Sequence, residues 1–398
     1  MISLLRRRNF LLFLGSELLG AQASIIGLTL VAVAAFDQSF VTSSMLGAIQ
    51  AILMVLLAFP AGVWVDRMRR RPVLVTAALA HSVLLFSVLA AWSLDLLTMS
   101  HLWVVAAGIG VASAFTGVAR PSFLPTLVHR DALIAANGTL TAFGSLAGLG
   151  AGRAVKWLLA IAAAPVALLI EAIGALVSAF LLHQINAPEA AAAGRRGFMK
   201  EFREGLGFLG NYPPLRVVTF ATSLAYLSLT VVTVNQARFP YNPMGLSDAT
   251  FGWLGTGGTA GAAAGALLAW PIARRIGRIR TFWLSLMATQ PFLLFVPNDW
   301  PGAFQAAPVF VQSLGFSVFV VTQVSCIQAI VPGGLLGRTT AAMYVLVTLL
   351  SMAGLLVSTL LNIFFSTQVV LLIGIAGLIA AGAVLMLSLQ PALSGKSS

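Results

Sequence analysis

The segment GVWVDRMRRR, from Gly62 to Arg71, places one carboxylate among four arginines between two long apolar runs. Asp66 comes just before the start of the second run, where a carboxylate can accept backbone N–H bonds and is stabilised by the dipole of a helix N-terminus. Arg70 and Arg71 can donate to carbonyls at helix C-termini or pair with acids, and Arg67 adds a further charge. The segment therefore predicts a contact between helix ends. The alternative is that its arginines only orient the chain in a membrane.

Ionisable side chains also occur inside the apolar runs, where each is costly in hydrocarbon and a candidate for function. Glu17 lies within the first run. A carboxyl group in such surroundings can carry a coupling proton. The alternative is a hydrogen-bonded glutamate that packs between helices.

A cationic pair lies in another run, where Arg153 and Lys156 are spaced to share one helix face. Because arginine stays protonated at any working pH, Arg153 can bind an anionic substrate. Alternatively it pairs with Glu171 in the next run, and Glu171 is then a second candidate for coupling. Lys156 can instead extend its ammonium group to the membrane interface.

Three further runs carry polar and aromatic side chains at helical spacing, so that each run has one such face. These side chains are Tyr226 and Thr230 in one run, Gln312, Phe316, Phe319 and Gln323 in the next, and Tyr344 and Ser351 in the third. Such faces suit an amphipathic small molecule, or they form hydrogen bonds between helices. His81 is expected to be structural. No residue pattern predicts a metal site, a cofactor site or an enzyme's nucleophile–base pair.

The elements that position these residues are transmembrane helices. Hydrophobic residues make up 59% of the chain and charged residues only 9%, whereas soluble domains carry about 25% charge. Runs of about 20 apolar residues can cross a bilayer. The expected helices are Phe10–Phe36, Met45–Trp64, Val73–Leu94, Leu102–Leu124, Ala135–Ala160, Val166–His183, Val217–Ala237, Phe251–Ala273, Phe282–Val296, Phe304–Val331, Thr340–Phe364 and Val369–Leu389. The fold class is an all-α membrane protein with twelve transmembrane helices.

The basic residues predict the orientation of these helices. With both termini in the cytoplasm, all but three of the 23 Lys and Arg residues fall on the cytoplasmic side, in agreement with the positive-inside rule. Although the net charge is +12, the basic residues form short clusters at helix ends rather than one continuous face, so no nucleic-acid partner is expected. The single cysteine, Cys326, excludes a disulfide within the chain.

The chain divides into two similar halves. A second basic loop, Arg274–Arg280, lies between apolar runs of the second half as Gly62–Arg71 does in the first. Such a repeat is typical of duplicated transporters. We expect an N-terminal six-helix bundle over residues 1–184, a cytoplasmic linker with an amphipathic helix over 185–216, and a C-terminal six-helix bundle over 217–398.

The motif Gly62-x-x-x-Asp66-Arg67-x-x-Arg70-Arg71 resembles the loop between spans two and three of the major facilitator superfamily. The segments 119–137 and 204–216 are similar to the macrolide-efflux and enterobactin-exporter branch. In that family the acid matching Asp66 holds the cytoplasmic gate shut against the start of span eleven, here near Gly337-Arg338. The resemblance implies gating roles for the motif residues and alternating access, usually coupled to proton entry.

One departure from the branch pattern affects the substrate. Arg153 ends the stretch Gly148–Arg153 where the branch usually shows Gly-Pro-x-x-Gly-Gly. We therefore expect proton-coupled export of a small amphipathic molecule, siderophore-like or drug-like, with an anion favoured. The alternative is an importer or flippase of an anionic lipid or metal chelate. The expected setting is the bacterial cytoplasmic membrane, with a monomer that needs no cofactor.

Overall fold

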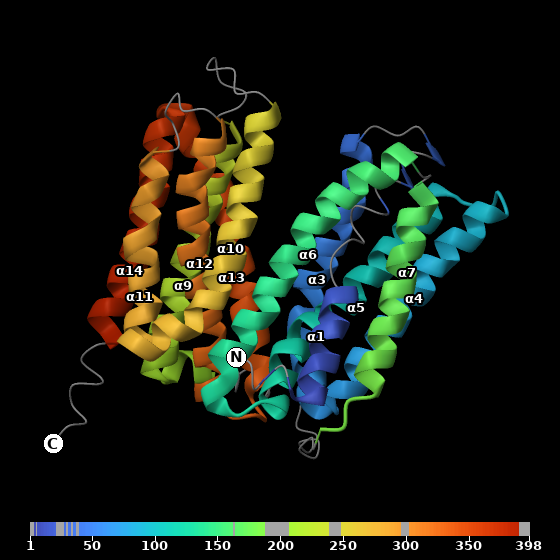
Figure 1. Ribbon diagram of the computed structural model, residues 1–398, viewed down its shortest axis with the longest axis horizontal. Coiled ribbons are helices and arrows are strands. Elements are labelled where there is room, and N and C mark those ends of the chain that lie inside the picture. The colour runs from blue at the N-terminus through green and yellow to red at the C-terminus, as the bar shows by residue number, and fades with distance from the viewer. Residues whose placement is uncertain are drawn as a thin grey trace. The chain divides into compact units, whose positions relative to one another are not determined.

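The computed structural model describes residues 4, 6–20, 28, 31, 32, 35, 36, 40–161, 164–187, 207–238, 248–295 and 302–389. Every regular element in these residues is a helix (Figure 1). The α-helices are α1 (Arg8–Gly20), α3 (Phe40–Arg67), α4 (Arg70–Ser93), α5 (Met99–Leu127), α6 (Leu133–Ile161), α7 (Ala164–His183), α9 (Pro213–Arg238), α10 (Asp248–Ile276), α11 (Arg278–Thr289), α12 (Gly302–Ile330), α13 (Leu336–Phe364) and α14 (Thr367–Leu389). Two 3-10 helices, η1 (Arg130–Ala132) and η3 (Gln290–Phe295), connect some of them.

The helices coincide with the apolar runs of the sequence. Among the described residues, eight helices are long and apolar enough to cross a membrane, or nine if the pair Met45–Ala58 and Pro60–Arg67, bent by 57°, counts as one span. A bend at this place is the expected effect of Pro60, because proline lacks the N–H that a straight helix needs. The chain is therefore a multi-pass membrane protein by helix length and composition.

Two predicted segments differ from the structure or lie outside its description. The predicted helix Phe282–Val296 begins earlier, at Arg278, and its α-helical part ends at Thr289 before continuing as η3. Pro291 explains this change, because its ring cannot fit the α-helical ladder. The predicted amphipathic helix of the linker, over residues 195–206, lies outside the described residues.

The contacts divide the chain into two compact units. The first contains Met1–Arg130, Gly150–Gly205 and Val331–Ala342, and the second contains Asp131–Leu149, Leu206–Ile330 and Met343–Ser398. The boundaries therefore pass through α6 and α13. The first turns of α13 pack with the helices of the first unit, and the first half of α6 packs with those of the second.

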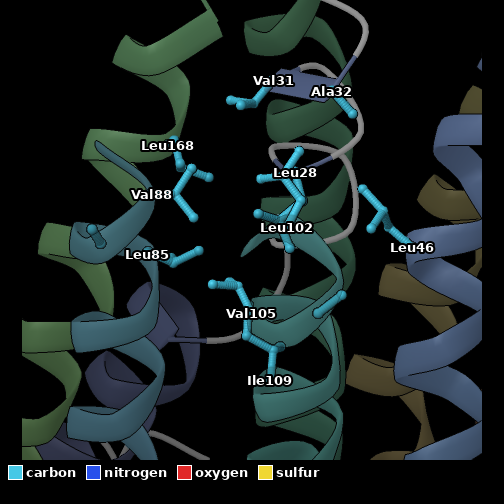
Figure 2. Packing of buried hydrophobic residues seen from close by; sticks show 12 residues of the cluster. Leu28, Val31, Ala32, Leu46, Leu85, Val88, Leu102, Val105, Ile109 and Leu168 are labelled. Atoms are coloured by element: carbon cyan, nitrogen blue, oxygen red, sulfur yellow. The ribbon is translucent and has the colours of Figure 1, made fainter. Parts of the chain in front are cut away.

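The core of the first unit is made by aliphatic side chains from α3, α4, α5 and α7. Leu46, Leu85, Leu102 and Leu168 are fully buried and converge with Leu28, Val31 and Ala32 (Figure 2). Beyond this core, α4 contacts both α5 and α7, and α1 packs against α7. Close packing of such side chains fixes how the four helices lie against one another, and it thereby fixes the positions of the polar groups between them.

In the second unit, α10 lies directly against α12 (Figure 1). Gly257, Gly261 and Gly265 form one stripe on α10, and a Cβ atom at any of them would run into a backbone carbonyl of α12. Small residues at this spacing let two membrane helices approach closely. The stripe therefore sets the separation of α10 and α12.

Candidate functional site

Asp66 forms a helix cap across the first unit. Its side chain is fully buried, and its two carboxylate oxygens accept the backbone N–H groups of Gly337 and Arg338, each at 2.9 Å. These amides belong to the first turn of α13, where N–H groups have no partner within the helix. The Arg338 side chain lies 3.5 Å from the same carboxylate. The end of α3 is thus bonded to the beginning of α13.

The neighbouring arginines of the motif bind carbonyl groups. Arg70 donates to the carbonyl of Gly333 at 2.6 Å, just before α13, and its guanidinium lies 3.7 Å from the Asp66 carboxylate. Arg71 donates to the carbonyls of Leu182, at 3.2 Å, and His183 at the end of α7. Free carbonyls at a helix C-terminus favour such cations.

The two remaining motif residues also lie at this junction. Gly62 faces α13 so closely that a Cβ atom would come within 2.5 Å of Ala341 Cβ and 3.0 Å of the Gly337 carbonyl oxygen. Arg67 is half-buried and is the last residue of α3. The motif therefore gathers around one helix start, and its gating role stays a prediction.

A polar cavity lies within the first unit, enclosed by α1, α4, α5 and α7. It has a volume of about 70 Å³, with Arg120, His81, Thr116 and Ser178 among its lining residues. Arg120 Nε lies 2.9 Å from Glu17 Oε1, so the glutamate of the first span has an arginine partner. A space of this size and polarity holds a few water molecules.

A second acid–base pair joins α4 to α7. His81 Nε2 lies 3.5 Å from Glu171 Oε1, and both side chains are largely buried. At the next position, Ser82 Oγ donates to the carbonyl of Ala172 at 2.8 Å, which holds the two helices together there. The side chain of Arg153, the partner suggested for Glu171 by the sequence, is outside the described part of α6. The structure shows His81 as a partner of Glu171.

Part of the predicted substrate face comes together in the second unit as an aromatic cluster. Tyr226 on α9 meets Phe316 on α12 edge to face, with ring centroids 5.5 Å apart. Phe316 also contacts Phe319, and Phe319 stacks on Phe282 at 5.0 Å. Phe319 is completely buried and presents no surface to a ligand in this conformation, whereas Tyr226 and Phe316 are partly accessible.

The polar members of the predicted faces are engaged locally. Thr230 and Ser351 donate to carbonyls one turn back in their own helices, at 3.0 and 2.9 Å. Gln312 and Gln323 are buried, and Gln312 Oε1 accepts a bond from Ser313 at 3.0 Å. Tyr344 is half-buried on α13. The structure thus brings Tyr226, Phe316 and Phe319 into one cluster, and substrate binding by these residues remains a prediction.

Sequence reasoning missed several polar contacts. Arg120 lies within the predicted helix Leu102–Leu124, and α5 places it at the cavity, where it pairs with Glu17. Asn235 on α9 bonds Ser358 and accepts from Asn362 on α13, at 2.9 and 3.0 Å. For the Arg120 contact, the only signal in the sequence was an arginine near the end of a long apolar run. Among the described residues, no group of His, Cys, Asp and Glu is arranged to hold a metal ion.

Comparison with known proteins supports this geometry at the level of the fold. No protein-family model and no curated protein matches the sequence. A bacterial homologue of the iron transporter ferroportin, solved in an outward-facing state, is 18% identical with a TM-score of 0.72, over 96% of this chain and 98% of that one. The human organic anion transporter MFSD10 is 15% identical with a TM-score of 0.69, over 96% and 98% of the two chains.

The Escherichia coli fucose:proton symporter is 12% identical with a TM-score of 0.72, over 97% of this chain and 98% of its own. A further structure of this symporter, described as a Major Facilitator Superfamily transporter in the outward conformation, has a TM-score of 0.73 at 13% identity, over 94% of this chain and 98% of that one. Because the likeness extends over nearly the whole chain, this protein has the major facilitator fold.

Proposed function

We propose that this protein is a secondary active transporter that works by alternating access and exports a small amphipathic molecule in exchange for protons. It would act as a monomer with twelve spans in two six-helix bundles, over residues 1–184 and 217–398, in the bacterial cytoplasmic membrane with both termini inside. The macrolide-efflux and enterobactin-exporter branch remains our proposal for its subfamily. Neither a cofactor nor an enzymatic activity is part of the proposal.

The observation that carries the proposal is the Asp66 cap on α13. A fully buried carboxylate on one helix holds two amides and an arginine of another, distant in sequence. Bonds of this kind are strong when made and costly when broken inside a protein, so the contact favours two discrete states, closed and open. Alternating access requires such a two-state element. The proton would be carried by one of two membrane carboxylates, Glu17 or Glu171.

The experiment is transport by the purified full chain in proteoliposomes. Taurocholate, an amphipathic anion, and ethidium, an amphipathic cation, serve as probes, each with and without an imposed pH gradient. We expect gradient-driven movement of the anion in exchange for protons. If transport of the probes does not respond to the pH gradient, proton coupling is contradicted. If a probe moves in the same direction as the protons, the protein is an importer. Anionic lipid or metal chelate would then become the substrate class to test.

Substrate charge gives a separate prediction for Arg153. Loss of a charge-assisted hydrogen bond costs about 1.5–3 kcal/mol, which corresponds to about 10- to 100-fold in affinity. We expect Arg153→Ala to weaken taurocholate binding by about this factor and to leave ethidium binding nearly unchanged. Equilibrium binding of both probes to the purified variant measures the effect. An equal loss for both probes contradicts an anion-binding role.

A further inference from the structure

Two acid–base pairs adjoin the polar cavity of the first unit, and they differ in kind. Glu17 is partnered by Arg120, whose guanidinium keeps its proton at all working pH values. Glu171 is partnered by His81, and histidine is a side chain that commonly accepts and passes on protons in proteins. Adding a proton to the first pair removes an ion pair, whereas adding one to the second can create an ion pair.

The two side chains of the second pair face each other without forming a hydrogen bond. His81 Nε2 and Glu171 Oε1 lie 3.5 Å apart, which is too far for a good hydrogen bond. Within the described part of the chain, His81 Nε2 and Glu171 Oε2 are buried atoms with no hydrogen-bond partner. Buried polar atoms without partners are costly, so a proton shared between these two side chains would relieve the cost.

The cavity supplies a route to this pair. His81 is one of its lining residues, and hydroxyl groups of Ser113, Thr116 and Ser178 lie in the same lining. Water in a small cavity of this polarity forms hydrogen bonds with such groups. Cavity water can therefore contact the His81 ring, whose Nε2 atom is itself buried, from the side away from the hydrophobic core around Leu85 and Val88.

We propose that His81 and Glu171 form one proton-binding site, filled through the polar cavity, and that this site couples proton movement to transport. A hydronium ion in the cavity gives its proton to the ring of neutral His81 and leaves a water molecule, and the imidazolium then carries a proton on both nitrogens, with Nε2 facing Glu171. The Nε2–H group donates to the Glu171 carboxylate, which adds a bond between α4 and α7 beside that of Ser82. Release returns the proton to water. The coupling role rests on the proposed transport function, but the proton site does not.

Other charged groups around the pair are few among the described side chains. Arg120 on α5 lines the same cavity, and its guanidinium pairs with Glu17 on α1. His101, also on α5, bonds Ser87 of α4 at 3.0 Å. The charged residues of α3, Asp66 and Arg67, lie at its end near α13. On α6 the side chains of Arg153 and Lys156 are outside the description. Because interacting groups titrate together, the pair is treated as one site.

The first test follows the imidazole of His81 directly. A variant with His101→Gln, His129→Gln and His183→Gln leaves His81 as the single histidine, and its carbon-13 NMR signal is titrated in reconstituted membranes. We expect Glu171→Gln to move the titration midpoint by about one pH unit or more, the usual effect of an opposite charge at this distance. Asp131→Asn, which alters an exposed carboxylate, is the matched control and should leave the midpoint in place.

An unchanged midpoint in Glu171→Gln, or a His81 signal that does not titrate at all, overturns the proton site. If Glu171→Gln fails to fold, Glu171→Asp keeps the charge on a shorter side chain and should move the midpoint in part. If the midpoint does not move in Glu171→Asp, the proton site is likewise overturned. These results do not depend on a transported substrate.

The second test concerns coupling, with taurocholate as the probe in proteoliposomes. We expect Glu171→Gln to lose the response to a pH gradient while downhill exchange continues, and Glu17→Gln to retain a response. Full gradient-driven accumulation by Glu171→Gln overturns the coupling role. If the unmodified protein moves neither taurocholate nor ethidium, the proposed function fails for these probes, and the NMR titration alone decides the proton site.

Discussion

Asp66→Asn is expected to break the closed contact between α3 and α13 and to reduce transport by about 100-fold or more. The asparagine loses its negative charge and one of the two acceptor oxygens, so that an NH₂ group faces a backbone N–H of α13. Hydrogen bonds to charged groups contribute about 1.5–3 kcal/mol each, and loss of about 3 kcal/mol corresponds to about 100-fold in an equilibrium. Insertion into the membrane should be unaffected, because the apolar runs are unchanged.

Hydrogen exchange at two amides measures this effect without a known substrate. The N–H groups of Gly337 and Arg338 are buried and bonded to Asp66, so their exchange reports opening of the contact. We expect exchange to become about 100-fold faster in Asp66→Asn. Asp131→Asn is a suitable control, since its carboxylate is 81% exposed and pairs with Arg278 at the surface. Normal exchange and normal transport in Asp66→Asn would contradict a gating role.

Gly261→Ala is expected to cause a clear loss of stability at the contact between α10 and α12. The new Cβ atom would overlap the carbonyl of Phe310 and lie 2.9 Å from its Cα atom. The obstacle is backbone of α12, which cannot rotate away as a side chain can. Overpacking of this kind costs about 1–3 kcal/mol and occasionally more, against about 1 kcal/mol gained from helix propensity. The net effect should be a lower unfolding midpoint.

The matched control lies on the same helix. Gly255 has open space around its Cα atom, with no atom within 4 Å of an added Cβ. Gly255→Ala should therefore leave stability unchanged or raise it by up to about 1 kcal/mol. Unfolding of both variants in mixed detergent micelles, followed by circular dichroism, gives the comparison. Equal midpoints for the two variants would show that α10 and α12 can separate at little cost.

The positions of the helices could be predicted from the sequence because crossing a bilayer imposes a local requirement. The predicted runs from Met45–Trp64 to Val369–Leu389 each coincide with an α-helix of the structure, except Phe282–Val296, whose second half is the 3-10 helix η3. Helix ends were less predictable. α5 continues to Leu127, beyond the predicted end at Leu124, and Arg120 stays within it because an arginine with a carboxylate partner can stay in a helix between others.

The capping chemistry of Asp66 could also be anticipated, because a carboxylate near a helix start has few other uses in hydrocarbon. Its partner amides at Gly337 and Arg338 could be named only through resemblance to a family. Pairings between side chains were beyond prediction. The polar faces on α9, α12 and α13 were regular in the sequence, but the bonds that Thr230 and Ser351 donate to carbonyls of their own helices were not predicted.

The pair His81–Glu171 shows the physical reason for this limit. Helical periodicity determines which residues share a face, but the rotation of each helix about its axis is set by packing with its neighbours. A small rotation of α4 or α7 would separate His81 from Glu171. The sequence around these two residues does not reveal how each helix is rotated. Hydrophobic length thus determines where the chain crosses the membrane, and tertiary packing alone decides which charges meet inside it.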